Sequence, residues 1–307
     1  MLKEIVVISG KGGTGKTSLV AALATLLESK VMADCDVDAA DLHLVLNPTI
    51  LEEHEFWSGK TAFINNDKCS VCGKCQELCR FEAIDLVEKG HNSLGDTTSK
   101  SEKSPQLILD NIACEGCGVC AYFCPNKAIT LEDNLSGHWF ISKTEYGPLV
   151  HARLGIAEEN SGKLVTLVKS EARKIAAQEN KNYLLIDGSP GIGCPVIASL
   201  SGCDLLLIVT EPTLSGIHDL ERITTLAQHF NIPQAVCINK SDINPEMSNE
   251  ILSFCQRKNI SVLGIIPYDR SVTQAQIHGQ STIEYAPDSP ATQEFTAIKN
   301  KLINLIS

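Results

Sequence analysis

Eight cysteines in the first half of the chain fall into two runs with the same spacing. The first run is Cys69, Cys72, Cys75 and Cys79, and the second is Cys114, Cys117, Cys120 and Cys124. This C-x₂-C-x₂-C-x₃-C spacing wraps three thiolates around one [4Fe–4S] cluster, and in proteins with two clusters the fourth cysteine of each run binds the other cluster. The spacing therefore predicts one cluster on Cys69, Cys72, Cys75 and Cys124, and a second on Cys114, Cys117, Cys120 and Cys79.

The two runs belong to an internal repeat. Ala83, Ile84 and Leu86 after the first run recur as Ala128, Ile129 and Leu131 after the second. The duplication indicates a small bacterial-type ferredoxin domain with two clusters. Arg80 stands where the second run has Pro125, which affects the local turn but not the ligands. Two zinc sites are the alternative, although zinc favours paired Cys-x-x-Cys knuckles separated by a longer gap. A purely structural role for the clusters is also open.

A glycine-rich segment near the N-terminus has the pattern of a phosphate-binding loop. It comprises Gly10, Lys11, Gly12, Gly13, Thr14, Gly15, Lys16 and Thr17, with Ser18 next, and it joins an expected strand to an expected helix. Glycines let backbone N–H groups converge on phosphate oxygens, and the helix N-terminus adds partial positive charge. In this pattern Lys16 reaches the terminal phosphates and Thr17 binds Mg²⁺. A glycine-rich turn without a ligand would not need all of these features together.

Lys11 is a second lysine that a standard phosphate loop does not require. It resembles the deviant Walker A signature of the superfamily that contains MinD, Mrp and the nitrogenase iron protein, in which this lysine reaches the nucleotide of the opposite subunit. Asp34-Cys35-Asp36 resembles the switch I of that superfamily, which implies that Asp36 positions the attacking water.

Later segments resemble the same superfamily. The stretch from Leu184 to Gly191 is similar to its Walker B and switch II, which implies that Asp187 lies near Mg²⁺ and that Gly191 senses the γ-phosphate. Two further segments resemble its adenine-recognising loops and contain Asn239, Lys240, Pro267 and Tyr268. Cys194 stands at the offset of a cysteine that helps to hold a bridging cluster in the nitrogenase iron protein. A switch-adjacent thiol is the alternative for this residue.

The resemblance implies an ATPase that binds ATP or ADP with Mg²⁺ and forms a homodimer when ATP binds. With Lys11 acting in trans, hydrolysis would be slow and would require the dimer. Catalysis of phosphoryl transfer by Lys11, Lys16, Asp36 and Asp187 needs only positioning and charge neutralisation. The expected activity is electron transfer to, or metal-cofactor assembly on, a partner protein. A nucleotide-switched scaffold with structural clusters is the second hypothesis.

Apolar runs that alternate with helical periodicity must position these residues. Strands are expected over Glu4 to Ser9, Lys30 to Ala33, Tyr183 to Ile186, Asp204 to Val209, Ala235 to Ile238 and Val262 to Ile266, and helices include Lys16 to Ser29, Leu164 to Gln178 and Phe295 to Ile306. This alternation predicts an α/β domain with a parallel sheet, a P-loop NTPase fold over 1–60 and 134–307. An α+β ferredoxin-like domain is expected as an insertion over 61–133. The polar stretch from Gly90 to Pro105 predicts a mobile loop. The segment 137–162 is expected to be the return crossing, in which the chain runs back from the inserted domain to the sheet.

The composition of this 307-residue chain argues against two classes of partner, nucleic acids and membranes. It has 26 Lys and Arg against 37 Asp and Glu, a net charge of −11, so nucleic acid is not an expected partner. No apolar run approaches the ~18 residues of a membrane span, and membrane binding is not expected. Thirteen cysteines, clustered mainly in two runs, are more typical of metal binding in a reducing compartment than of disulfides. We therefore expect a cytoplasmic protein.

Overall fold

The computed structural model describes residues 2–88, 105–155 and 161–306. It divides into two compact units. One comprises Met1–His54, His138–Leu154 and Ser161–Ser307, and the other Glu55–Gly137 with Gly155–Asn160. The second unit begins before residue 61 and ends after residue 133 because two 16-residue strands lead into and out of it. The expected loop from Gly90 to Pro105 lies outside the described residues, apart from Pro105 itself.

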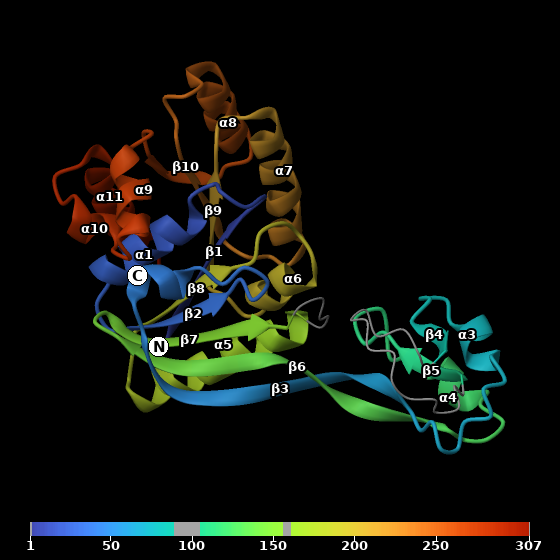
Figure 1. Cartoon of the computed structure of the whole chain (residues 1–307). Helices are drawn as coiled ribbons and strands as arrows, with labels where there is room; N and C mark the ends of the chain where they lie inside the picture. Colours follow the sequence, from blue (N-terminus) through green and yellow to red (C-terminus); the bar gives the residue numbers. More distant parts are fainter. Residues whose placement is uncertain (1, 89–104, 156–160, 307) are drawn as a thin grey trace. The chain divides into compact units, whose positions relative to one another are not determined.

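A nine-stranded sheet forms the framework of the first unit (Figure 1). In spatial order its strands are β11 (Ser261–Ile265), β10 (Gln234–Ile238), β9 (Leu205–Thr210), β1 (Lys3–Ser9), β8 (Tyr183–Gly188), β2 (Lys30–Cys35), β7 (Gly147–Leu154), β6 (Ile129–Thr144) and β3 (Thr49–Ile64). The run from β11 to β7 is parallel. The predicted α/β class with a mostly parallel sheet is therefore confirmed.

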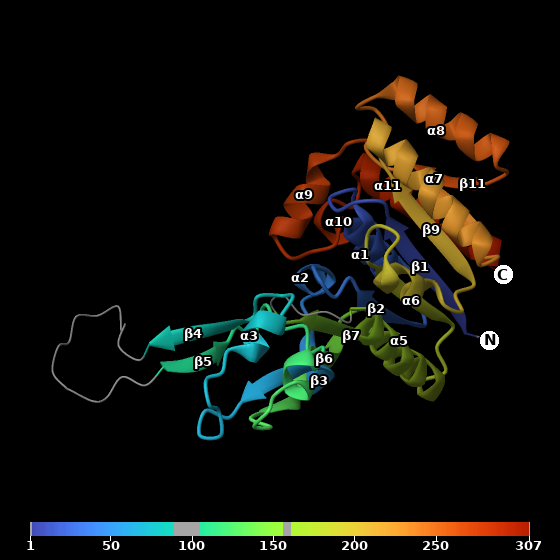
Figure 2. The ribbon, with the colours of Figure 1, turned by 90° about the vertical axis from the view of Figure 1, so that its right-hand side faces the viewer.

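Helices cover both faces of this sheet, because its central strands are apolar on both sides. The helices α1 (Lys16–Leu26), α2 (Leu42–Leu46), α9 (Arg270–Ile277), α10 (Thr282–Tyr285) and α11 (Pro290–Ile306) pack together on one face. The helices α5 (Ser161–Gln178), α6 (Cys194–Leu200), α7 (Leu214–His229) and α8 (Pro245–Arg257) pack against β1, β2 and the strands β7 to β11 (Figures 1 and 2). Strand residues Ile5 and Val7 are fully buried in a core that includes Leu19 and Leu23 of α1 and Phe295 of α11. Within the described residues, no helix combines the length and apolarity needed to cross a membrane.

The segment 137–162, expected as a return crossing, contributes two strands instead. Most of it forms the end of β6 and all of β7, and β7 pairs in parallel with β2 from Met32 to Asp34. α5 then begins at Ser161, before the expected Leu164. The sequence pattern was ambiguous here because β6 alternates irregularly between buried and exposed residues.

The second unit contains a two-stranded antiparallel sheet and two short helices. They are β4 (Ile84–Glu88), β5 (Pro105–Leu109), α3 (Lys74–Leu78) and α4 (Val119–Tyr122). Its core has few aliphatic residues, among them Ala62, Ile84, Leu107 and Ile129. Cys75 is buried with them, and four further cysteines pack against this core. Cysteine side chains thus supply much of the interior of this unit.

Candidate functional site: a phosphate loop and two cysteine-lined hollows

The glycine-rich loop lies at the carboxyl end of β1 and leads directly into α1. Gly15 has a φ of 90°, and a Cβ at this residue would overlap with the side-chain amide of Asn239. That amide donates a 2.7 Å hydrogen bond to the carbonyl oxygen of Thr14. Asn239 therefore fixes the shape of the loop from the end of β10, which lies beyond β9 from β1 in the sheet, and glycine is required where the two meet.

Lys16 is surrounded by carboxylates at the floor of the loop. Its ammonium pairs with Asp187 at the end of β8 and lies 3.2 Å from Asp36, which follows β2. Burial alone would lower the pKa of Lys16, but Asp187, Asp36 and Asp34 together raise this pKa to about 12. The lysine is therefore a cation held among carboxylates at the floor of the loop.

Asp187 and Thr17 fit a magnesium ion. Asp187 is 1% exposed, and its Oδ1 pairs with Lys16. Its Oδ2 is buried and has no hydrogen-bond partner among the described residues. The hydroxyl of Thr17 lies 3.5 Å from the ammonium of Lys16, so both oxygens are in the same region. A buried carboxylate oxygen and a threonine hydroxyl near the same ammonium are oxygen donors of the kind that Mg²⁺ accepts, with water and phosphate oxygens completing its coordination.

Asp34 is a site residue to which the sequence analysis gave no role of its own. It is fully buried and accepts hydrogen bonds from the backbone N–H groups of Asp36 and Leu42, at 3.1 and 3.2 Å. Burial raises the pKa of Asp34 well above its usual range, and Asp187 adds to the effect. Burial likewise raises the pKa of Asp36. Asp34 thus holds the turn that presents Asp36 to Lys16. The acidic triplet at the end of a buried strand was the signal in the sequence.

Glu211 is a second residue that the sequence analysis missed. One carboxylate oxygen lies 2.7 Å from the ammonium of Lys11, and the other lies 3.2 Å from that of Lys240. Lys240 also donates to the carbonyl of Gly13 at 3.0 Å. Although burial acts in the opposite direction, hydrogen bonds from the two lysines lower the pKa of Glu211. Glu211 directly follows β9, and only the fold brings it to the loop.

Two adjoining hollows surround the loop. The first has a volume of about 990 Å³ and is lined by loop residues from Gly12 to Ser18 with Asp36 and Pro190. The second, of about 540 Å³, is lined by Asn239, Lys240, Pro267 and Tyr268, the residues expected to recognise adenine. Gln276 of α9 lines both and donates a 2.8 Å hydrogen bond to Ser18. Gly191 has a φ of 91° and donates its N–H to the carbonyl of Ser9, which holds the segment after β8 beside the loop.

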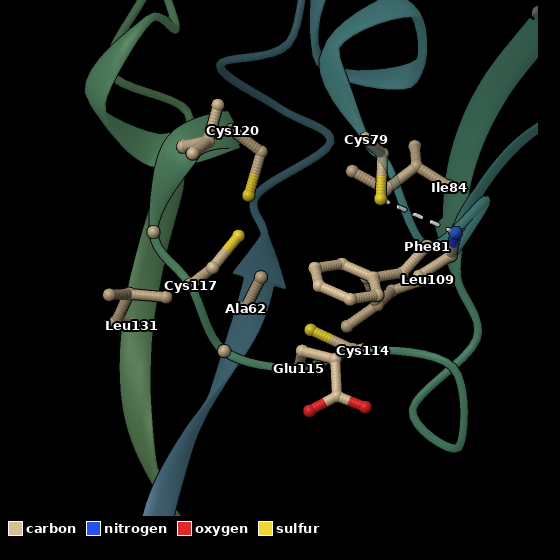
Figure 3. A pocket seen from close by; sticks show the side chains of 14 residues that line it. Ala62, Cys79, Phe81, Ile84, Leu109, Cys114, Glu115, Cys117, Cys120 and Leu131 are labelled. Atoms are coloured by element: carbon tan, nitrogen blue, oxygen red, sulfur yellow. Dashed lines mark hydrogen bonds between the residues drawn. The ribbon is translucent and has the colours of Figure 1, made fainter.

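The second unit contains two hollows, each lined by four cysteines. Cys79, Cys114, Cys117 and Cys120 line one hollow of about 350 Å³, and their sulfurs point toward a common centre (Figure 3). Cys69, Cys72, Cys75 and Cys124 line the other, of about 300 Å³. Each set takes three cysteines from one run and the fourth from the other run. This is the grouping that two [4Fe–4S] clusters require.

The described residues do not form a ready-made site for a single metal ion. Among the described residues, no three His, Cys, Asp or Glu side chains converge closely enough to hold one metal ion. A zinc site would bring four ligands to one point. Backbone N–H groups also donate to sulfurs, from Ala83 to Cys79 at 3.4 Å and from Ala128 to Cys124 at 3.3 Å. Such bonds stabilise the negative charge that thiolates carry.

The remaining cysteines lie in other surroundings. Cys35, Cys237 and Cys255 are buried in the core of the first unit and Cys203 is half-buried, and burial raises the pKa of each of these thiols. Cys194 is exposed at the first residue of α6. The structure thus places Cys194 after the switch-like segment at a solvent-accessible position.

Comparison with known proteins agrees with this geometry. The family described as CobQ/CobB/MinD/ParA nucleotide binding domain matches residues 5–283. An uncharacterised protein of Methanocaldococcus jannaschii is 33% identical over 247 residues, which cover 80% of each chain. Ferredoxin-3 of Nostoc sp. is 31% identical over 78 residues, 24% of this chain and 80% of that protein. Among solved structures, the septum site-determining protein MinD of Pyrococcus horikoshii, in complex with Mg-ADP, matches with a TM-score of 0.59. That match has 16% identity and covers 99% of this chain and 97% of the other.

Proposed function

The chain belongs to the CobQ/CobB/MinD/ParA nucleotide binding domain family, and on this premise we propose a dimer-forming ATPase whose nucleotide state governs a two-[4Fe–4S] electron carrier. The carrier would deliver electrons to a partner protein or help to assemble a metal cofactor on it. One observation carries the proposal. Eight cysteines form two four-sulfur hollows within a chain that also has a complete phosphate loop.

On the nucleotide side, each residue would act from its position around the loop. Loop N–H groups and Lys16 would bind the phosphates, while Thr17 and Asp187 would hold Mg²⁺. Asp36, held by Asp34, would orient the attacking water. Lys11 would leave Glu211 and contact the nucleotide of a second copy, so that ATP joins two chains and hydrolysis releases them.

On the metal side, the cysteine sulfurs would bind and orient the clusters. Burial raises the pKa of Cys75 and Cys120, and because a cluster binds thiolates, its assembly there would release their protons. The clusters, when bound, would supply one-electron transfer. This side of the protein would carry charge and would not catalyse bond chemistry.

The test is potentiometry of the anaerobically reconstituted full chain. We expect about eight iron atoms per chain, reversible reduction, and midpoint potentials that differ between the ADP state and a state with a non-hydrolysable ATP analogue. The Lys16→Ala variant is the control, because it removes the phosphate contact and should make the potentials independent of nucleotide. Zinc in place of iron would contradict the proposal.

A nucleotide-switched scaffold is the second candidate. One observation favours it, because the core of the second unit is small and is completed by cysteines, so clusters there would hold the unit together. Clusters that cannot be reduced reversibly, or whose potentials do not respond to ATP, would support this candidate instead.

A further inference from the structure

The internal repeat makes the two cysteine-lined hollows comparable residue by residue. Both have the same four ligand types in the same order, so any difference between them arises from their other lining residues. We call the hollow of Cys69, Cys72, Cys75 and Cys124 the first site, and that of Cys79, Cys114, Cys117 and Cys120 the second site. Equivalent positions of the repeat can then be read in pairs.

Three such pairs differ in polarity. Ser70 and Lys74 line the first site, and their repeat equivalents Glu115 and Val119 line the second. Asn126 lines the first site and its equivalent Phe81 lines the second. The first site therefore has a cation and two polar residues where the second has an anion and two apolar residues.

The positive charge of Lys74 lies beside the first site. Its ammonium lies 5.5 Å from the centroid of the Phe123 ring, and Phe123 directly precedes the ligand Cys124. Asn126 donates a 2.6 Å hydrogen bond to Ser70 across the same site. Arg80, which directly follows the second-site ligand Cys79, is exposed and lines neither hollow. The first site thus has a cation that the second site lacks among its lining residues.

The second site is more apolar and carries the opposite charge. Phe81 lies between Cys79 and Cys114, and Ile84, Leu109 and Leu131 are among the other lining residues (Figure 3). Glu115 lies at the rim with its carboxylate turned away from the sulfurs (Figure 3). Its charge therefore acts over a longer distance than a direct contact.

Hydrogen bonds from backbone N–H groups to the cysteine sulfurs also favour negative charge at the first site more than at the second. In the first site, Val71 donates its backbone N–H to Cys69, Ala128 to Cys124 and Gln76 to Cys75. In the second site, Ala83 donates to Cys79 and Ala121 to Cys120, so among the described residues the bond to Cys69 has no equivalent at Cys114. One-electron reduction adds a negative charge to a cluster without making or breaking bonds. Cations, amide donors and polar surroundings all favour that charge, and an anion and apolar surroundings oppose it.

We propose that the two sites differ in reduction potential, and that the first site accepts the electron before the second. This inference rests on the proposed function, because it requires a [4Fe–4S] cluster in each hollow. An electron that enters the second site would then pass to the first, so the repeat would set the direction of transfer within the unit.

The test exchanges residues between the two halves of the repeat. We would titrate the full, reconstituted chain with dithionite and mediators and record the EPR signal of the reduced clusters in the parent, Lys74→Val and Glu115→Ser. The parent should titrate in two steps. Lys74→Val should lower the reduced-to-oxidised ratio of the upper step about tenfold at a fixed potential, a shift of about 59 mV for one electron. Glu115→Ser should raise the reduced-to-oxidised ratio of the lower step by a smaller factor, about threefold, at a fixed potential. Glu250→Gln in α8 is the control for a charge change in the other unit and should shift neither step.

The outcomes separate the two proposals. A chain that binds about eight iron atoms but titrates in one step, or whose lower step responds to Lys74→Val, overturns this inference and leaves the proposed function intact. A chain without iron overturns both. Two steps, of which only the upper responds to Lys74→Val, support the inference.

Discussion

Lys11 is held by a carboxylate of its own chain. Glu211 pairs with both Lys11 and Lys240, and the hydroxyl of Ser215 lies 3.1 Å from the Lys11 ammonium. The side chain of Lys11 is 39% exposed, so the pair is partly screened by solvent and contributes about 1 kcal/mol or less. A contact of that strength can hold the lysine in one chain and still release it to a second chain.

Replacing Glu211 by Gln should therefore favour the ATP-bound dimer. Without the carboxylate, Lys11 no longer has to leave an ion pair, and we expect the dimer dissociation constant to fall about threefold. Analytical ultracentrifugation with a non-hydrolysable ATP analogue would measure the change. Glu221→Gln, on the exposed part of α7, is the matched control. A weaker dimer in Glu211→Gln would show that Glu211 supports the interface instead.

His151 should make stability depend on pH. It is buried, its Nε2 lies 2.9 Å from the hydroxyl of Ser142, and its ring stacks on Phe140. Burial, with a smaller contribution from His43, lowers its pKa from 6.5 to about 4. The unfolded chain binds more protons than the folded chain between these values. The free energy of unfolding should therefore fall as pH drops from about 6.5 to about 4, by about 3 kcal/mol in all.

Urea unfolding at pH 7, 6 and 5, followed by circular dichroism, would test this dependence. His151→Gln keeps a partner for Ser142 but cannot take up the proton, so its stability should fall less across this range. His54→Gln changes a half-exposed histidine and should behave as the parent. Equal slopes in the parent and His151→Gln would show that the burial of His151 is not responsible.

At the scale of elements, the two halves of the cysteine repeat differ in how tightly a turn is packed. Gly116 has a φ of 59°, and a Cβ there would overlap with the carbonyl oxygen of Lys60. Its repeat equivalent Val71 adopts a φ of 53° and carries a side chain. The backbone conformation is thus shared, and the close approach of Lys60 distinguishes the second site.

Gly116→Val should consequently disturb one cluster site and leave the other. We expect about half of the iron to be lost, because the turn between Cys114 and Cys117 cannot keep its path. Val71→Gly is the matched control and should keep all of the iron, since glycine adopts positive φ without strain. Iron analysis and EPR after anaerobic reconstitution would measure both. Full iron content in Gly116→Val would mean that the backbone of β3 shifts at Lys60 to make room for the side chain.

The elements that sequence patterns predicted well are those whose burial follows a simple period. The expected strands at β1, β8, β9 and β10 agree with the structure to within one or two residues at each end, because their burial is nearly continuous. β3 could not be found in this way, since most of its side chains are exposed and its pairing depends on backbone hydrogen bonds to β6. The positions of Asp187 and the cysteine runs followed from local motifs. Glu211 and Gln276 required the fold, because it brings them to the loop from distant segments.

At the scale of the whole molecule, we expect a change of bound nucleotide to change the oligomeric state of the protein. In the structure, the ammonium of Lys16 forms ion pairs with Asp187 and Asp36, and that of Lys11 forms an ion pair with Glu211. ATP with Mg²⁺ would have to displace these partners, and the lysines would then bind phosphates of one or both nucleotides. A variant that binds ATP but cannot hydrolyse it should therefore accumulate as a dimer.

Asp36→Ala is that variant, because it removes the residue proposed to orient the attacking water. With ATP under anaerobic conditions, light scattering should give twice the mass of a single chain, and the dimer should persist for hours while the parent returns to the monomer as ATP is consumed. Asp36→Asn keeps the size of the side chain and guards against a folding defect. Lys11→Ala should bind ATP as a monomer and hydrolyse it far more slowly than the parent. If Lys11→Ala dimerised on ATP and hydrolysed it at the parent rate, the lysine would not act across an interface. Nucleotide binding would then have to affect the clusters of the same chain without the contact between chains.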